Sequence, residues 1–109
     1  MREGQKRIRE NRRFNGSGSL MLSDGQRFPA TYNITEYQEY LEFSDSPDVK
    51  GLLSYRGTVW SEGLSAAFQK VETTIVFEDG RTLDIMIKNY NIMEQFASVL
   101  GNGRVEDAR

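Results

Sequence analysis

The chain contains no cysteine and no histidine among its 109 residues. Without cysteine it can form neither a disulfide bond nor a thiolate nucleophile. Without histidine it lacks the commonest general base, metal ligand and near-neutral pH switch. We therefore expect a protein that is not an enzyme and that holds neither a metal ion nor a cofactor.

Long apolar segments are also missing from the chain. No apolar run approaches the roughly 20 residues that are needed to cross a membrane. Met1 is followed by Arg2 and Glu3 and then by further charged residues, with no apolar stretch like the middle of a signal peptide. These absences predict a cytoplasmic protein with no membrane partner. With 38% hydrophobic and 28% charged residues, the chain has the composition of one globular domain with its own core.

Charge is distributed unevenly along the sequence. Residues 1–13 contain six basic and two acidic side chains, whereas the remainder contains eight basic and fourteen acidic ones. Apart from Met1, this basic segment has one apolar residue, Ile8, and so cannot bury a face. We expect a flexible basic segment over residues 1–13, a single β domain over 14–103 and a disordered tail over 104–109.

One pattern occurs twice: an apolar run, then Asp-Gly, then a second alternating run. The two copies cover residues 20–32 and 75–87. Asp-Gly between such runs predicts a β-hairpin. Only a loop with an odd number of residues keeps the apolar side chains of both strands on one face, because side chains alternate with period two. We therefore predict three-residue turns with Gly25 and Gly80 at positive φ.

The remaining segments complete the predicted fold. Residues 52–60 alternate as a strand in which Gly57 marks a bulge or a close approach. Aromatic residues favour a bulged strand over residues 36–43, with a short capped helix as the alternative. Apolar residues at helical spacing over 91–100 favour a helix that ends at Gly101, with an edge strand as the alternative.

Together these elements predict an all-β fold, or a mainly β fold with one short C-terminal helix. The connection over residues 61–69 has room for one helical turn. We expect a small antiparallel barrel or rolled sheet of five to six strands, because closure or a covering helix removes exposed sheet edges.

The basic segment supplies one set of candidate site residues. Its arginines can neutralise phosphate groups, which predicts salt-dependent binding of a nucleotide or nucleic acid as an alternative function. The candidate phosphate-binding residues are Arg7, Arg9, Arg12 and Arg13.

Part of this region resembles PilZ domains. Arg9 and Arg13 have the Arg-x-x-x-Arg spacing that opens those domains, and residues 15–17 are similar to the start of their second motif, Asp/Asn-x-Ser-x-x-Gly. Leu20 stands where that motif has glycine. The resemblance covers about ten residues and implies, as a variant of nucleotide binding, a barrel that binds cyclic di-GMP.

A second set of residues predicts a protein contact surface. Tyrosine and tryptophan are enriched at interfaces, and two apolar side chains fall on the outward face of the second hairpin. The candidate interface residues are Tyr37, Tyr40, Trp60, Val76 and Met86. The leading hypothesis is a non-enzymatic binding or accessory module that acts through protein–protein contact or self-association, for example as a homodimer. A carboxylate-based hydrolase is a further alternative, although the sequence marks no particular pair of acids.

Overall fold

The computed structural model describes residues 4–68 and 72–107 and shows an antiparallel sheet that closes in a ring. Its strands are β1 (Gln5–Leu22), β2 (Arg27–Phe43), β3 (Ser46–Ser61), β4 (Thr73–Val76), β5 (Thr82–Asn91) and β6 (Phe96–Gly101). Their order around the ring is β1-β2-β3-β6-β5-β4. The predicted small antiparallel barrel or rolled sheet is confirmed.

Alternating apolar side chains fill the interior of the ring. Ile75 and Leu83 lie opposite each other on β4 and β5, and both are fully buried. The rings of Phe14 and Phe77 stack with centroids 4.7 Å apart, which joins β1 to the end of β4. The short helix α1 (Leu64–Ala67) follows β3 and buries Leu64 at one end of the ring. In the described part of the chain, no helix is long and apolar enough to span a membrane.

Both Asp-Gly turns have the predicted geometry. Gly25 and Gly80 each have φ of +91°. In the second hairpin the Phe77 N–H donates to the Arg81 carbonyl over 2.7 Å, so that three residues form the loop; the first hairpin closes in the same way. This is the left-handed glycine that a three-residue hairpin loop requires.

The structure decides between strand and helix for the two segments where the sequence allowed both. Residues 36–43 are strand, as favoured, and the register shifts between Gln38 and Tyr40 show the expected irregularity. The helix favoured over residues 91–100 is wrong, because residues 96–101 form β6, which pairs with both β3 and β5. Its alternating residues Ala97 and Val99 are buried, and that burial decides in favour of strand. The helical turn lies instead in the connection after β3.

The predicted flexible basic segment is also wrong for the residues that the structure describes. β1 begins at Gln5 and continues into the barrel, and it pairs with β2 from Gln5 to Met21 except at Asn11, where the register shifts between Glu10 and Arg12. Backbone pairing with β2 orders a segment that has no apolar face of its own. Residues 1–3 lie outside the described residues.

The predicted disordered tail is corrected in part. Glu106 forms two backbone hydrogen bonds with Thr82, of 3.0 and 2.8 Å, and Val105 packs against the core. These contacts hold residues 105–106 on the barrel. Residues 108–109 lie outside the described residues.

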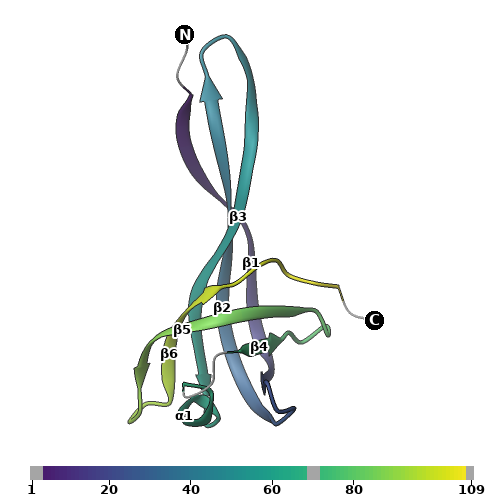
Figure 1. The fold of residues 1–109 in the computed structure, drawn as a ribbon, viewed down its shortest axis with the longest axis vertical. Helices are drawn as coiled ribbons and strands as arrows, with labels where there is room; N and C mark the ends of the chain where they lie inside the picture. The colour runs from purple at the N-terminus through teal and green to yellow at the C-terminus, as the bar shows by residue number, and fades with distance from the viewer. Residues whose placement is uncertain (1–3, 69–71, 108–109) are drawn as a thin grey trace.

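The first three strands extend well beyond the ring (Figure 1). β1, β2 and β3 have 18, 17 and 16 residues, whereas β4 has 4 and β6 has 6. The molecule measures 51 × 31 × 22 Å, and its radius of gyration is 16.1 Å. A compact domain of this length has a radius of gyration of about 13 Å. The extra length of three strands therefore makes an elongated molecule: a barrel with a projecting arm.

Candidate functional site

The arm consists of residues 5–13 of β1, 36–43 of β2 and 46–55 of β3. On β1, the pairing with β4 is confined to residues 19–22, and on β3 the pairing with β6 is confined to residues 56–60. Within the described residues, both edges of the arm are therefore open. β1 has no buried side chain before Phe14, and β3 has none before Tyr55. The buried side chains of β2 within the arm are Glu36 and Gln38, and both are polar. The arm therefore has no apolar core of its own and depends on its attachment to the barrel.

The face of the arm that continues the barrel interior is charged. Period-two alternation carries the inward face of β2 from the barrel out to Tyr40 and Glu42. Arg7 and Arg9 of β1 bond to the two oxygens of Glu42 over 3.3 and 3.2 Å, and Arg9 lies 3.9 Å from Asp48. The Arg9 guanidinium also lies 4.9 Å from the centre of the Tyr40 ring. Each exposed pair contributes at most about 1 kcal/mol, but together they link β1, β2 and β3.

Where the arm meets the barrel, Glu36 points into the interior and is 1% exposed. Arg12 grips it with two bonds of 3.0 and 2.9 Å, Tyr55 donates over 2.6 Å, and the Asn11 amide donates to the same carboxylate. These bonds, with that of Arg12 foremost, lower the Glu36 pKa to about 2 although burial opposes the shift. The Val105 N–H donates to the Tyr55 hydroxyl over 3.3 Å, so the C-terminal segment joins the network.

This network at Glu36 has a structural role. A carboxylate that accepts four hydrogen bonds and keeps its negative charge to about pH 2 is a poor general base at neutral pH. Its bonds join β1, β2 and β3 at the base of the arm. We call this group of Asn11, Arg12, Glu36 and Tyr55 the base lock.

The opposite face of the arm, which continues the outside of the barrel, carries apolar side chains. Leu41 and Val49 are cross-strand partners, and Ile8 lies one row away opposite Glu39. Ile8 is 57% exposed, Val49 51% and Leu41 36%. Phe43 follows Leu41 by two residues on the same face and is half-buried. We call these four residues, Ile8, Leu41, Phe43 and Val49, the arm patch.

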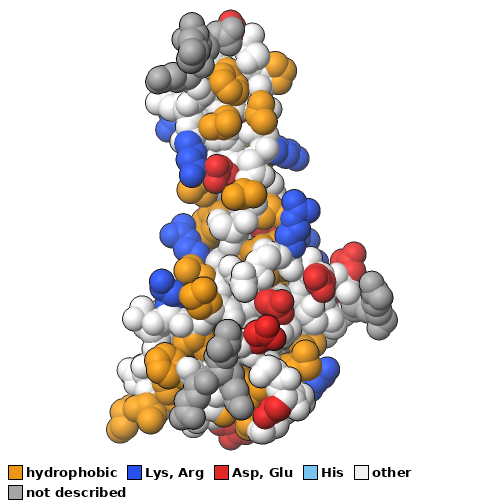
Figure 2. All heavy atoms as spheres, in the orientation of Figure 1, with side chains coloured by type: hydrophobic (Ala, Val, Ile, Leu, Met, Phe, Trp, Pro, Cys, Tyr) orange, Lys and Arg blue, Asp and Glu red, His pale blue; other side chains and the backbone are white. Residues whose placement is uncertain are grey.

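The space-filling view shows how these side chains are distributed (Figure 2). Apolar side chains gather near the far end of the arm, and Lys and Arg side chains flank the narrower region below them. A further apolar group is visible at the lower end of the barrel in Figure 2. Ile92 and Met93, in the turn between β5 and β6, are 68% and 88% exposed.

The structure places each predicted phosphate-binding arginine beside a carboxylate. Arg7 and Arg9 face Glu42, and Arg12 belongs to the base lock. Arg13 bonds to Glu10 over 2.9 Å. β1 supplies five cations and one carboxylate to the arm region, and residues 36–56 supply five carboxylates and two cations. The positive charge of the N-terminal sequence is thus largely neutralised by β2 and β3.

The predicted interface residues are not brought together. Tyr37 lies on the outer face of the arm beneath Arg56, whose guanidinium is 4.6 Å from the ring centre, while Tyr40 lies on the charged face. The remaining three residues, Trp60, Val76 and Met86, lie on the barrel strands β3, β4 and β5. Their role in an interface stays a prediction, as separate contact points.

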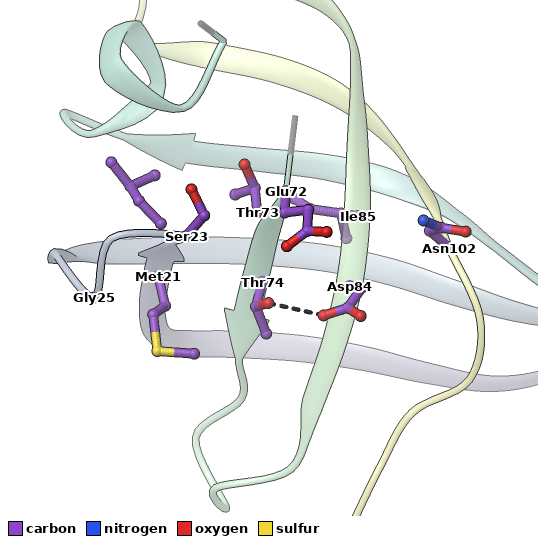
Figure 3. Close-up of a pocket in the computed structure, with 10 residues that line it drawn as sticks. Met21, Ser23, Gly25, Glu72, Thr73, Thr74, Asp84, Ile85 and Asn102 are labelled. Carbon is purple, nitrogen blue, oxygen red and sulfur yellow. Dashed lines mark hydrogen bonds between the residues drawn. The ribbon is translucent and has the colours of Figure 1, made fainter. Parts of the chain in front are cut away.

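A hollow of about 350 Å³ lies where β1, β4 and β5 meet (Figure 3). Glu72 and Asp84 line it, and Asp84 accepts a hydrogen bond of 2.8 Å from Thr74. Both carboxylates are exposed, whereas acid catalysis of glycoside hydrolysis uses a carboxyl group whose surroundings keep it protonated. In the described ranges, no group of three or more acidic side chains is placed to hold a metal ion.

Comparison with known proteins gives no relative: no family model, curated protein or solved structure matches the chain. The residues that resemble PilZ motifs all lie on one strand, β1. The arm and the groups around its base are the features of the structure that bear on function.

Sequence reasoning missed Glu36, Tyr55 and Arg56 as site residues. A signal for Glu36 was present, because Tyr32, Ile34 and Glu36 continue one inward phase along β2. A carboxylate in the phase of buried residues needs a cation, and Arg12 is that cation. The partnership itself depends on the pairing of β1 with β2, which places residue 12 opposite residue 36.

Proposed function

We propose that this protein is a non-enzymatic, cytoplasmic binding module that contacts a partner protein through the outer face of its arm. The observation that carries the proposal is the arm patch on a projecting sheet with no core of its own. Exposed apolar side chains that are grouped with charged neighbours are typical of interaction sites rather than of free surface.

The charges around the patch support the same function. Lys6 lies opposite Leu41 on this face, and its ammonium group is 3.5 Å from the Glu39 carboxylate. This ion pair lies between Ile8 and Leu41, within the patch, where it keeps the free protein in solution and gives a partner polar groups with which to set register. The base lock fixes the arm to the barrel, so the patch is presented in a defined orientation.

The test compares partner capture by two matched variants. Ile8→Thr/Leu41→Thr/Val49→Thr removes the apolar character of the patch while keeping residues that favour strands. Ile92→Thr/Met93→Thr removes a comparable exposed apolar group from the barrel end. Quantitative crosslinking should detect a protein that the wild type and the barrel variant bind and that the arm variant loses.

Light scattering of the same three proteins tells whether the partner is a second copy. A species above 12.5 kDa that disappears only in the arm variant identifies self-association as the contact. Equal capture by all three proteins, with equal masses in solution, would contradict the proposal. Circular dichroism checks that each variant keeps its sheet.

A further inference from the structure

Two arginines flank one threonine at the base of the arm. Arg13 of β1 is the cross-strand partner of Thr35 of β2, and Thr35 is the partner of Arg56 of β3. Cross-strand partners share a face of the sheet, and this row lies on the outer face, on the side away from the base lock. Neighbouring strands are about 4.8 Å apart, so the two arginines leave the sheet roughly 10 Å from each other.

Polar groups line an open hollow of about 430 Å³ over this row. The residues that line it are Arg13, Asn33, Thr35, Tyr37, Arg56, Gly57 and Thr58. Hydroxyl, amide and guanidinium groups can all donate hydrogen bonds, and this set of described lining residues contains no carboxylate. The hollow therefore favours an anion.

The two arginines differ in how they are held. Arg56 has its guanidinium over the Tyr37 ring and, within the described part of the chain, no carboxylate within ion-pair distance. Arg13 bonds to Glu10 through Nε and Nη2, over 3.0 and 2.9 Å. Glu10 lies in the neighbouring row opposite Tyr37 and competes for Arg13.

We propose that this hollow, the arginine row of Arg13, Thr35 and Arg56, binds a single phosphate group on a compact ligand. Two guanidinium groups and a central hydroxyl can surround a phosphate with charge-assisted hydrogen bonds. Residues 14–109 carry eight basic and fourteen acidic groups, which disfavours a long polyanion such as nucleic acid. The site is separate from the arm patch and does not depend on the protein-binding role.

The test is a titration with inorganic phosphate and with phenyl phosphate, followed through the arginine Nε–H signals in NMR spectra. Saturable shifts at both Arg13 and Arg56 are expected. Arg56→Gln should weaken phenyl phosphate binding about tenfold or more, since charged hydrogen bonds are lost. Arg27→Gln, which removes an exposed arginine at the start of β2, is the matched control and should leave binding unchanged.

Two further measurements sharpen the result. Glu10→Gln removes the carboxylate that competes with phosphate for Arg13, and this change should tighten phosphate binding several-fold. A single-stranded oligonucleotide should bind no more tightly than phenyl phosphate at the same salt concentration. The proposal is overturned if Arg56→Gln and Arg27→Gln weaken binding equally, if phosphate gives no saturable shift, or if the oligonucleotide binds far more tightly.

Discussion

The barrel and the arm are built from the same three strands but are stabilised in different ways. In the barrel the inward face of β2 carries Tyr32 and Ile34, which are buried among apolar neighbours. In the arm the same face carries Tyr40 and Glu42, which lie among charges. A strand can therefore continue past the end of its core when cross-strand ion pairs replace apolar packing, and such an extension depends on the point where it is anchored.

The largest expected effect comes from breaking that anchor. Arg12→Leu leaves the Glu36 carboxylate buried without its main partner, which should lower the unfolding free energy by about 3–5 kcal/mol at neutral pH. Arg9→Leu removes an arginine from the same strand and face but from an exposed pair, and should cost about 1 kcal/mol or less. Urea denaturation measures both, and equal losses would show that the base lock is no more important than the arm pairs.

Protonation of Glu36 at low pH should weaken the base lock in the same way. The folded-state pKa of Glu36 is lowered to about 2 from 4.5, so its contribution is present above about pH 4.5 and is lost as the pH falls toward 2. That shift corresponds to about 3 kcal/mol of unfolding free energy. The difference in stability between wild type and Glu36→Gln should therefore be constant above about pH 5 and shrink below it. A difference that does not change between pH 5 and pH 2 would contradict this assignment.

Replacing a glycine by alanine should cost more stability in the barrel than in the arm, because the barrel strands pack more closely at Gly18 than the arm strands do at Gly51. A Cβ at Gly18 would collide with the Val76 carbonyl where β1 meets β4, whereas a Cβ at Gly51 would lie 3.3 Å from the Glu39 side chain, which can move. Gly18→Ala should cost about 1–3 kcal/mol. Gly51→Ala should stay within about 1 kcal/mol of wild type in either direction. Thermal unfolding of the pair tests this, and a larger loss at Gly51 would reverse the comparison.

The smallest change in stability is expected for a valine-to-threonine substitution in the arm, compared with the same substitution in the barrel. Val49→Thr replaces a half-exposed methyl group by a hydroxyl and should change stability by less than about 0.5 kcal/mol. Val59→Thr makes the same change at a fully buried barrel position and should cost about 1–3 kcal/mol, because a hydroxyl is taken out of water. Comparable losses at both positions, measured by urea denaturation, would mean that the arm has a core after all.

Much of the barrel could be predicted from the sequence because its determinants are local. The phase of apolar residues around each Asp-Gly required three-residue turns, and both glycines have the predicted φ. The helix expected over residues 91–100 failed because spacing alone does not distinguish a helix from a turn followed by a strand. Ala97 and Val99 are buried only because β3 and β5 lie on either side of them.

The arm was missed because its order depends on residues far apart in the sequence. Residues 5–13 have no apolar periodicity and look unstructured when they are read alone. Their partners are the carboxylates of β2 and β3, about 25 to 40 residues away, at Glu36, Glu42 and Asp48. The candidate phosphate site has the same origin, since Arg13 and Arg56 become neighbours only across Thr35.

The sequence by itself determined the all-β class, the two hairpins and the positive φ of Gly25 and Gly80, because alternation and turn chemistry act over a few residues. Tertiary structure alone decided that the basic N-terminal segment is a strand, that its charges are largely neutralised, and that Glu36 is buried. Those outcomes follow from strand pairing over long sequence separations, which brings each arginine to a carboxylate that local pattern does not reveal.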